Sequence, residues 1–276
     1  MAAPAEGSRS LNDDQVAQLA RQLDEAEAAR SPLRHFSLVH PTMTLADAYA
    51  VQSAWVALDV ESGRSIRGCK VGLTSLAMRR AAGIDEPDYG VLFEDMFGLD
   101  GHEFAHAAFI APRIEMELAF ALATPLAGPG CTVAEVLRAT DFVIPAFEII
   151  DTRFHRFDPD TNRPRTIVDT IADNAANAAV VLGGRPVRPT DIDLRWVGGL
   201  LYRNNTIAET GVSAAVLNHP ANAVAWLVNK LATHEQSLNA GEIVLSGSFT
   251  ASIALDPGDA IFGDFGVLGT LACRFT

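Results

Sequence analysis

The sequence predicts an α+β fold in which an N-terminal helical region, residues 1–64, precedes a β-rich body, residues 65–276. Two runs of strong helix formers, with apolar residues at helical spacing, lie before residue 62. After residue 66, short apolar runs separated by glycine and proline dominate, a pattern typical of strands joined by turns. A chain of 276 residues is long enough for one large or two small domains.

The helical region is expected to hold two helices. The first spans residues 12–30 and is capped by Asn12 or Asp13, because short polar side chains satisfy the free N–H groups of a helix start. The second opens at a capping box formed by Thr44 and Asp47 and ends near residue 61. A loop with two prolines separates the helices, and no residue of the region suggests catalysis.

The β-rich body begins with Ile66–Leu73, a strand interrupted by glycines, which often mark the close approach of a ligand or another backbone. We expect the elements that follow to be a short helix after Thr74-Ser75, a turn at Pro87–Gly90, a strand at 114–122, a helix at 132–140, a strand at 142–150, a hairpin turning at Asn204-Asn205, a helix at 220–232 and strands around 260–262 and 266–275.

The strand 114–122 carries the first candidate site. Apolar residues occupy every second position of this strand, and glutamates and alanines occupy the positions between them. Glu115 and Glu117 therefore project from one face, next to small alanines. Like charges this close raise each other's pKa, and a hard divalent cation such as Mg²⁺ or Mn²⁺ would relieve the repulsion. The alternative is a solvated face of an antiparallel sheet, which the pattern alone favours.

A third carboxylate strengthens the metal hypothesis. Glu148 is the one charge in the apolar run 142–150, and burying a lone carboxylate is costly unless it is paired or bound to a metal. The alternative is an edge-strand glutamate that faces water. Glu115, Glu117 and Glu148 together would suit Mg²⁺ with open positions, whereas the seven histidines show no zinc-ligand spacing.

Other polar residues have both structural and chemical interpretations. Lys70 lies between glycines and is either a surface lysine or a partly desolvated amine that pairs with a carboxylate or enolate oxygen. Asp88, in its predicted turn, is more often a turn former than an acid. Ser246, Ser248 and Thr250 lack the order of a nucleophile elbow, so their hydroxyls are better suited to contacting a carboxylate.

Composition narrows the class of protein. Hydrophobic content of 49% and charged content of 20% fit a globular protein with a sizeable core. The net charge of −13 argues against nucleic acid and anionic membranes as partners, although a bound metal can still create a site for an anionic small molecule. The absence of a long apolar run or signal-like segment predicts no membrane span and a cytoplasmic setting, with free thiols at Cys69, Cys131 and Cys273.

Six segments, taken together and in this order, resemble the hydratase and decarboxylase branch of the fumarylacetoacetate hydrolase superfamily. The resemblance runs from about residue 10 to the end of the chain, and it is specific as a set although each piece alone is weak. The segments are Gly68–Ser75, Pro87–Gly90, Pro112–Glu117, Pro145–Asp151, Asp173–Asn177 and Gly247–Thr250.

The resemblance implies a mixed β-sheet roll or barrel, a homo-oligomer, and Mg²⁺ or Mn²⁺ bound by Glu115, Glu117 and Glu148. It places the active-site lysine and aspartate of the family at Lys70 and Asp88. The residues implied to bind a small-molecule 2-oxo dicarboxylate are Leu73, Thr74, Asn174, Ser248 and Thr250. The sequence departs from the family at Ala251-Ser252, where an Arg-Pro pair is expected, and near 263–266, where His and Tyr are expected.

The implied reaction is hydration of a 2-hydroxy-2,4-dienoate, with the seven-carbon dioate as expected substrate. The departures at 251–252 and 263–266 put the binding of its distal carboxylate in doubt. Three enzymatic alternatives remain: decarboxylation of a 2-oxo-3-enedioate such as 4-oxalocrotonate, hydration of 2-oxopent-4-enoate, and C–C bond hydrolysis. The last of these requires a general-base histidine near the metal. A non-enzymatic β-rich binding or scaffold protein is the alternative from a different class.

Overall fold

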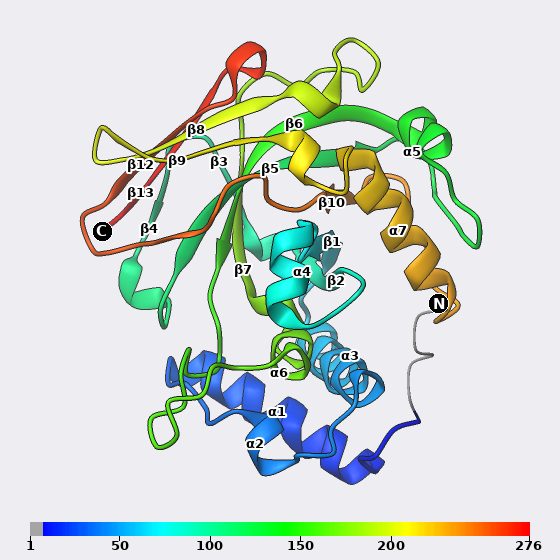
Figure 1. Ribbon diagram of the computed structural model, residues 1–276, viewed down its shortest axis with the longest axis vertical. Helices are drawn as coiled ribbons and strands as arrows, with labels where there is room; N and C mark the ends of the chain where they lie inside the picture. The colour runs from blue at the N-terminus through cyan, green and yellow to red at the C-terminus, as the bar shows by residue number, and fades with distance from the viewer. Residues whose placement is uncertain (1–7) are drawn as a thin grey trace.

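The larger of two mixed sheets crosses the centre of the protein in the computed structural model, which describes residues 8–276 (Figure 1). It has eight strands in the order β2-β1-β10-β5-β6-β7-β3, with β11 paired to β5. These strands are β1 (Ile66–Gly72), β2 (Asp88–Phe93), β3 (Phe97–Leu99), β5 (Arg113–Leu122), β6 (Thr140–Ile150), β7 (Asn177–Leu182), β10 (Ile243–Leu245) and β11 (Ile253–Ala254).

The smaller sheet has five strands in the order β4-β13-β12-β8-β9. Its strands are β4 (His102–Phe104), β8 (Gly198–Arg203), β9 (Thr206–Val212), β12 (Ala260–Asp264) and β13 (Thr270–Phe275). Asn204 and Asn205 turn the β8–β9 hairpin with φ of 52° and 64°, as expected for a two-residue turn with left-handed positions. The two sheets, with the helices beside them, confirm the predicted α+β class.

Four helices gather at one end of the molecule, shown at the bottom of Figure 1: α1 (Asp13–Ala29), α2 (Phe36–Val39), α3 (Leu45–Glu61) and α6 (Ile167–Ala172). The two long predicted helices are confirmed, with Asn12 and Thr44 as their caps. The short α2 lies where we expected only a loop. Because α3 packs on α6, which is distant in sequence, the helical end includes a later segment. A domain boundary at residue 64 stays a prediction.

The remaining helices are α4 (Leu76–Ala82), capped by Ser75, α5 (Val133–Ala139) and α7 (Pro220–Ala232). The expected turn at residues 87–90 is wrong, because β2 already begins at Asp88. Residues 88–90 pair with β1, Asp88 opposite Gly72 and Gly90 opposite Lys70, so Asp88 lies on a strand rather than in a turn.

Burial explains why the central strands position a site. On β5, the apolar side chains Ile114, Met116 and Leu118 are fully buried, and Glu117 on the opposite face is only 1% exposed. The sheet is therefore covered on both faces here. The three cysteines are free and buried, as expected. Over residues 8–276, no helix combines the length and apolar character that crossing a membrane requires.

Asp47 joins the starts of α1 and α3. Its buried carboxylate accepts hydrogen bonds from Ser10 N and Leu11 N, both at 2.9 Å, and from Thr44 N and Oγ1, both at 2.8 Å. Burial opposes the charge, but these donors outweigh it and lower the pKa of Asp47 to about 2. The residue that we expected to complete a capping box therefore also anchors the segment before α1.

We predict that Asp47→Asn lowers the free energy of unfolding at pH 7 by about 1 to 2 kcal/mol, the usual cost of losing charge-assisted caps. Because the folded-state pKa lies below the ordinary value, the stabilisation is complete above about pH 4 and is lost as the pH falls through about 2. Urea denaturation of both proteins across this range measures it. The exposed Asp141→Asn is the control, and an equal loss at pH 7 in both variants contradicts the prediction.

Candidate active site

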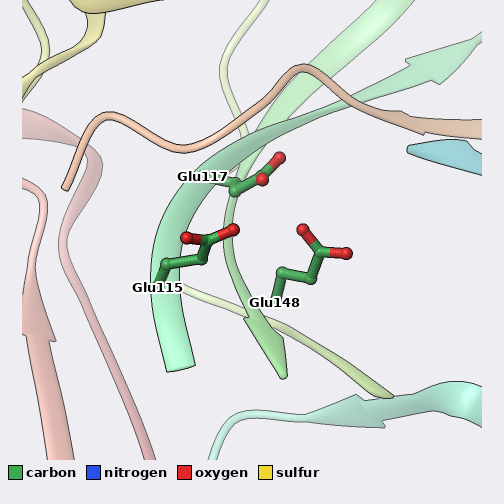
Figure 2. A group of neighbouring side chains, drawn as sticks. All are labelled: Glu115, Glu117 and Glu148. Atoms are coloured by element: carbon green, nitrogen blue, oxygen red, sulfur yellow. The ribbon is translucent and has the colours of Figure 1, made fainter. Parts of the chain in front are cut away.

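The register of β5 and β6 brings three carboxylates together. Glu115 lies directly opposite Glu148 in the antiparallel pair, and Glu117 lies two residues along the same face of β5. Figure 2 shows the three side chains converging from the two strands. One carboxylate oxygen from each lies within 4.8 Å of the others, which is the spacing of groups that share one metal ion. Within residues 8–276, no other group of His, Cys, Asp or Glu meets this criterion.

The environment of these carboxylates opposes their charge. Glu117 and Glu148 are each 1% exposed, so the interpretation as a solvated sheet face fails for them. Burial, followed by the charge of Glu148, raises the pKa of Glu115 to about 8. Burial and the neighbouring Glu148 and Glu115 raise the pKa of Glu117 well above its ordinary value. A nearby cation would reverse these shifts by stabilising the ionised forms.

The site residues fit a hard divalent cation. Gly247 N donates to Glu117 Oε2 at 2.7 Å, but Glu117 Oε1 and Glu148 Oε2 are buried and accept no hydrogen bond from any described residue. Buried carboxylate oxygens without donors are costly unless another positive group approaches them. An all-oxygen donor set suits Mg²⁺ or Mn²⁺ rather than zinc, and no histidine belongs to the cluster among the described residues.

Lys70 provides one of the charges that the carboxylates need. Its side chain is buried, and Nζ lies 3.1 Å from Glu148 Oε1 in an ion pair. Burial alone would lower the pKa of Lys70, but the charges of Glu148 and Asp88 outweigh it and raise the pKa. The lysine is therefore a buried ammonium group inside the site, and the interpretation as a surface lysine does not hold.

Asp88 lies beside Lys70 because the residue opposite it has no side chain. A Cβ at Gly72 would be 2.1 Å from Asp88 Oδ1 and 3.5 Å from Lys70 Nζ, so glycine leaves room for both groups. The close approach of Asp88 to Gly72 is of the kind that the glycines of Ile66–Leu73 predicted. Both Asp88 oxygens are buried, with no hydrogen-bond donor among the described residues. Burial raises the pKa of Asp88, against the opposing effect of Lys70.

Ser248 and Thr250, which the resemblance implies bind substrate, follow β10 and contact the strand β5 that carries Glu115 and Glu117. Thr250 Oγ1 accepts a hydrogen bond from Met116 N at 3.1 Å, and Ser248 Oγ is 3.2 Å from Met116 O. Met116 lies between the two glutamates of β5, so both hydroxyls are at the site. Thr74 packs against Gly247, where a Cβ would be 2.4 Å from Thr74 Oγ1. Their role in binding substrate stays a prediction.

Leu73 and Asn174, two further residues that the resemblance implies bind substrate, lie next to β1 and β2 rather than β5. Leu73 follows β1 with a φ of 54°, a left-handed conformation that is rare for a branched side chain and often marks a functional site. The Asn174 side chain is engaged by the backbone of β2, since Oδ1 accepts from Val91 N at 2.7 Å and Nδ2 donates to Val91 O at 3.0 Å. Asn174 therefore positions the strand that carries Asp88, and contact with substrate stays a prediction.

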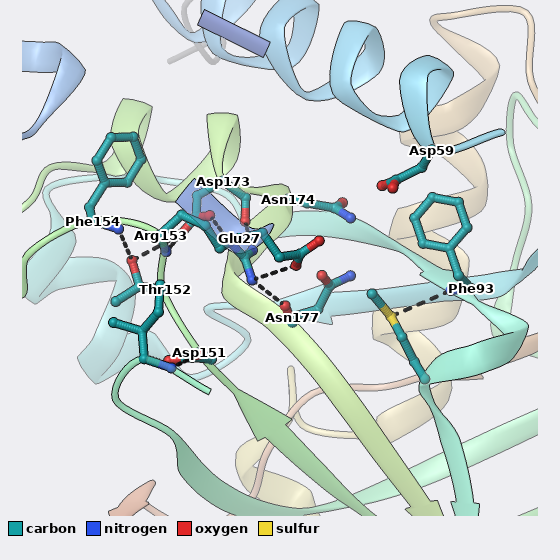
Figure 3. Close-up of polar contacts among 12 residues, drawn as sticks. Glu27, Asp59, Phe93, Asp151, Thr152, Arg153, Phe154, Asp173, Asn174 and Asn177 are labelled. Carbon is teal, nitrogen blue, oxygen red and sulfur yellow. Dashed lines mark hydrogen bonds and ion pairs between the residues drawn. The ribbon is translucent and has the colours of Figure 1, made fainter. Parts of the chain in front are cut away.

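A buried arginine holds the segment around Asn174. Arg153 donates to Asp173 Oδ1 at 2.5 Å, to Asp173 O at 2.8 Å and to Asn177 O at 2.9 Å (Figure 3). Its guanidinium also lies over the Trp55 ring. These contacts join α3 to the segment between α6 and β7. No local sequence pattern indicates this network, because Arg153, Asp173 and Asn177 become neighbours only in the folded chain.

Comparison with known proteins identifies relatives along nearly the whole chain. The chain is 55% identical to 2-oxo-hept-4-ene-1,7-dioate hydratase of Escherichia coli over 257 residues. The matched region covers 93% of this chain and 96% of that protein. The chain is 37% identical over 268 residues to 4-oxalocrotonate decarboxylase of Pseudomonas putida, with coverage of 97% and 99%. No protein-family model matches the chain.

Solved structures agree with this assignment. 4-Oxalocrotonate decarboxylase from Pseudomonas putida G7, complexed with magnesium and adipate, is 35% identical and superimposes with a TM-score of 0.93 over 98% of this chain and 100% of that chain. Fumarylpyruvate hydrolase from Pseudomonas aeruginosa, at 16% identity and a TM-score of 0.59 over 77% of this chain and 90% of its own, shares the fold alone. The chain belongs to the family of hydratases and decarboxylases that these relatives form, which confirms the resemblance to that branch of the fumarylacetoacetate hydrolase superfamily.

Proposed function

We propose that the protein is a metal-dependent hydratase that converts 2-hydroxyhepta-2,4-diene-1,7-dioate, through 2-oxo tautomers, to 4-hydroxy-2-oxoheptanedioate in the catabolism of aromatic compounds. The observation that carries the proposal is the cluster of Glu115, Glu117 and Glu148, the last two of them buried, beside Lys70 and Asp88. The 55% identity to the hydratase named above supports the substrate. We also propose that the ion is Mg²⁺ or Mn²⁺.

Glu115, Glu117 and Glu148 would hold the ion, which when bound supplies a Lewis acid for the substrate's C1 carboxylate and C2 oxygen. Lys70, as a buried ammonium, is placed to stabilise negative charge on that oxygen. The Ser248 and Thr250 hydroxyls would orient the C1 carboxylate.

Two steps, each with proton transfers, complete the chemistry. The dienol loses its O–H proton and gains a proton at C5, which gives a 2-oxo-3-ene, and water then adds at C4 while C3 is protonated. Asp88 is the best candidate to exchange these protons, because burial moves its pKa upward toward the working pH. The adjacent Lys70 keeps the aspartate oriented when it is ionised.

Decarboxylation of a 2-oxo-3-enedioate is the second candidate, since the 0.93 TM-score shows how closely a decarboxylase shares this scaffold. The same carboxylates and ammonium would stabilise the enolate that remains when carbon dioxide leaves. Hydration of 2-oxopent-4-enoate needs the same head-group chemistry. The homo-oligomer and the cytoplasmic setting also stay predictions.

We predict that the purified protein with Mg²⁺ converts freshly generated 2-hydroxyhepta-2,4-diene-1,7-dioate to a product heavier by one water. Mass spectrometry of the reaction mixture measures this directly. Loss of carbon dioxide from the substrate would instead support decarboxylation and overturn the hydratase proposal.

Mg²⁺ or Mn²⁺ is expected to raise the melting temperature of the wild-type protein, by about 5 °C at a hundredfold excess over Kd, because the ion binds the folded state only. Glu117→Gln keeps the side-chain size and removes one ligand charge, so it should abolish most of this shift. Differential scanning fluorimetry with and without EDTA measures the shift. The exposed Glu25→Gln should keep it in full, and an equal shift in both variants would exclude the proposed metal site.

Asp88→Asn and Lys70→Gln should each lower kcat at least about 100-fold, because each removes a group assigned to proton transfer or charge stabilisation. Steady-state kinetics, with circular dichroism to verify the fold, measures the effect. Asp85→Asn, an exposed change three residues before Asp88, is the matched control. Unchanged rates in a folded Asp88→Asn variant would remove Asp88 from the mechanism.

A further inference from the structure

The strand that carries Asp88 lies at the edge of the larger sheet. β2 is the first strand in the sheet order, and within residues 8–276 only β1 pairs with it. Alternate residues of an edge strand direct their N–H and C=O groups away from the sheet, where each group needs another partner. Contacts from outside the sheet can therefore fix the position of Asp88 through the outer side of β2.

Amide side chains take the place of a neighbouring strand along this outer side. Gln52 Nε2, from α3, donates to Tyr89 O at 2.8 Å. Two residues along the strand, Asn174 Oδ1 accepts from Val91 N at 2.7 Å and Asn174 Nδ2 donates to Val91 O at 3.0 Å. The carbonyl of the residue after Asp88 is thus held by Gln52, whereas Asn174 holds the middle of the strand.

The face of β2 behind Asp88 borders a cavity. Tyr89 and Val91 line this cavity, which has a volume of about 350 Å³, together with Cys69 of β1 and Gln52. Asp88 projects from the opposite face of the strand, because side chains alternate along it. Side chains beside a cavity make fewer packing contacts than those in a filled core. The hydrogen bond from Gln52 therefore contributes more to the position of β2 than it would in a fully packed region.

Gln52 is itself fixed by its surroundings. It is 2% exposed, which is unusual for glutamine and is costly unless the amide is hydrogen-bonded. Three residues earlier on the same face of α3, the Tyr49 ring stacks on Tyr89, with ring centroids 5.0 Å apart and an interplanar angle of 19°. Three residues later, the Trp55 ring lies against the Arg153 guanidinium. α3 is therefore held at both sides of Gln52 and presents its amide to β2 in a fixed place.

We propose that Gln52 is a positioning residue for the reaction: its hydrogen bond to Tyr89 O holds the start of β2 so that the Asp88 carboxylate stays beside Lys70. The inference rests on the role of Asp88 in the proposed function. Gln52 lies on the cavity side of the strand, so it acts through the backbone and not by touching the reacting groups. A shift of the Tyr89 carbonyl carries Asp88 with it, because the two residues are adjacent in the chain.

Gln52→Met tests the positioning role, because methionine resembles glutamine in length and has no donor for Tyr89 O. With 2-hydroxyhepta-2,4-diene-1,7-dioate as substrate, kcat should fall about tenfold, since misplacing a reacting group by about 1 Å can cost about 100-fold. KM should change less than about twofold, because Asp88 is assigned to proton transfer and not to substrate binding. Gln18→Met, the same change at an exposed residue of α1, is the matched control and should leave both constants unchanged.

A double-mutant cycle with Asp88→Asn distinguishes positioning from a general structural effect. If Gln52 acts through Asp88, Gln52→Met lowers kcat in the wild-type background and lowers it no further in the Asp88→Asn background. A fall by the same factor in both backgrounds would overturn the proposal. If Asp88→Asn loses activity as expected but a folded Gln52→Met variant keeps the wild-type kcat, the proposed function stands and the positioning role is overturned. If Asp88→Asn keeps wild-type activity, the roles of both residues are overturned.

Hydrogen exchange, measured by mass spectrometry, tests the same contact without turnover. Amides of β2 should exchange at least about fivefold faster in Gln52→Met than in the wild type or Gln18→Met, while those of β5 and β6 keep their rates, because only the edge strand loses a contact. If Gln52→Met does not fold, Gln52→Asn replaces it in both experiments; its shortened amide should give smaller changes in the same direction. Wild-type exchange rates in β2 of the folded variant would overturn the proposal.

Discussion

Repulsion among three clustered carboxylates, two of them buried and one half-buried, is the constraint on which the site depends. Glu115, Glu117 and Glu148 are held together by the register of β5 and β6, in surroundings that raise the pKa of the first two. Lys70 offsets part of the charge through its ion pair with Glu148. One ammonium is not enough for three carboxylates and Asp88, so the arrangement is stable in its ionised form only with further positive charge. A divalent cation supplies that charge and also the Lewis acid that the chemistry requires.

The rest of the fold can be understood as support for this arrangement. Gly72 lets Asp88 approach Lys70, and Gly247 brings a backbone N–H to Glu117. The strand with Asp88 is held by Asn174, whose segment is anchored by the buried Arg153 against the N-terminal helices. We infer that the helical end of the molecule, which carries none of the proposed catalytic groups, positions one wall of the site through these contacts.

Local sequence patterns predicted what depends on neighbouring residues. Alternation placed Glu115 and Glu117 on one face, and the caps at Asn12 and Thr44 were visible as short polar residues before helix formers. Features set by distant pairing were not predictable in this way. That Glu148 lies opposite Glu115, and that Asp88 lies on a strand, follow from sheet register. Arg153, in a segment without periodicity, acquires its partners Asp173 and Asn177 only in the folded chain.

Anomalous diffraction from crystals grown with Mn²⁺ tests the central claim most directly, because it locates the ion without relying on activity. The account predicts one Mn²⁺ peak between β5 and β6, with oxygens of Glu115, Glu117 and Glu148 at about 2.1 Å, the distance typical of small divalent ions with carboxylates. A Mn²⁺ ion bound elsewhere, or an empty position between these three carboxylates at saturating Mn²⁺, would contradict it.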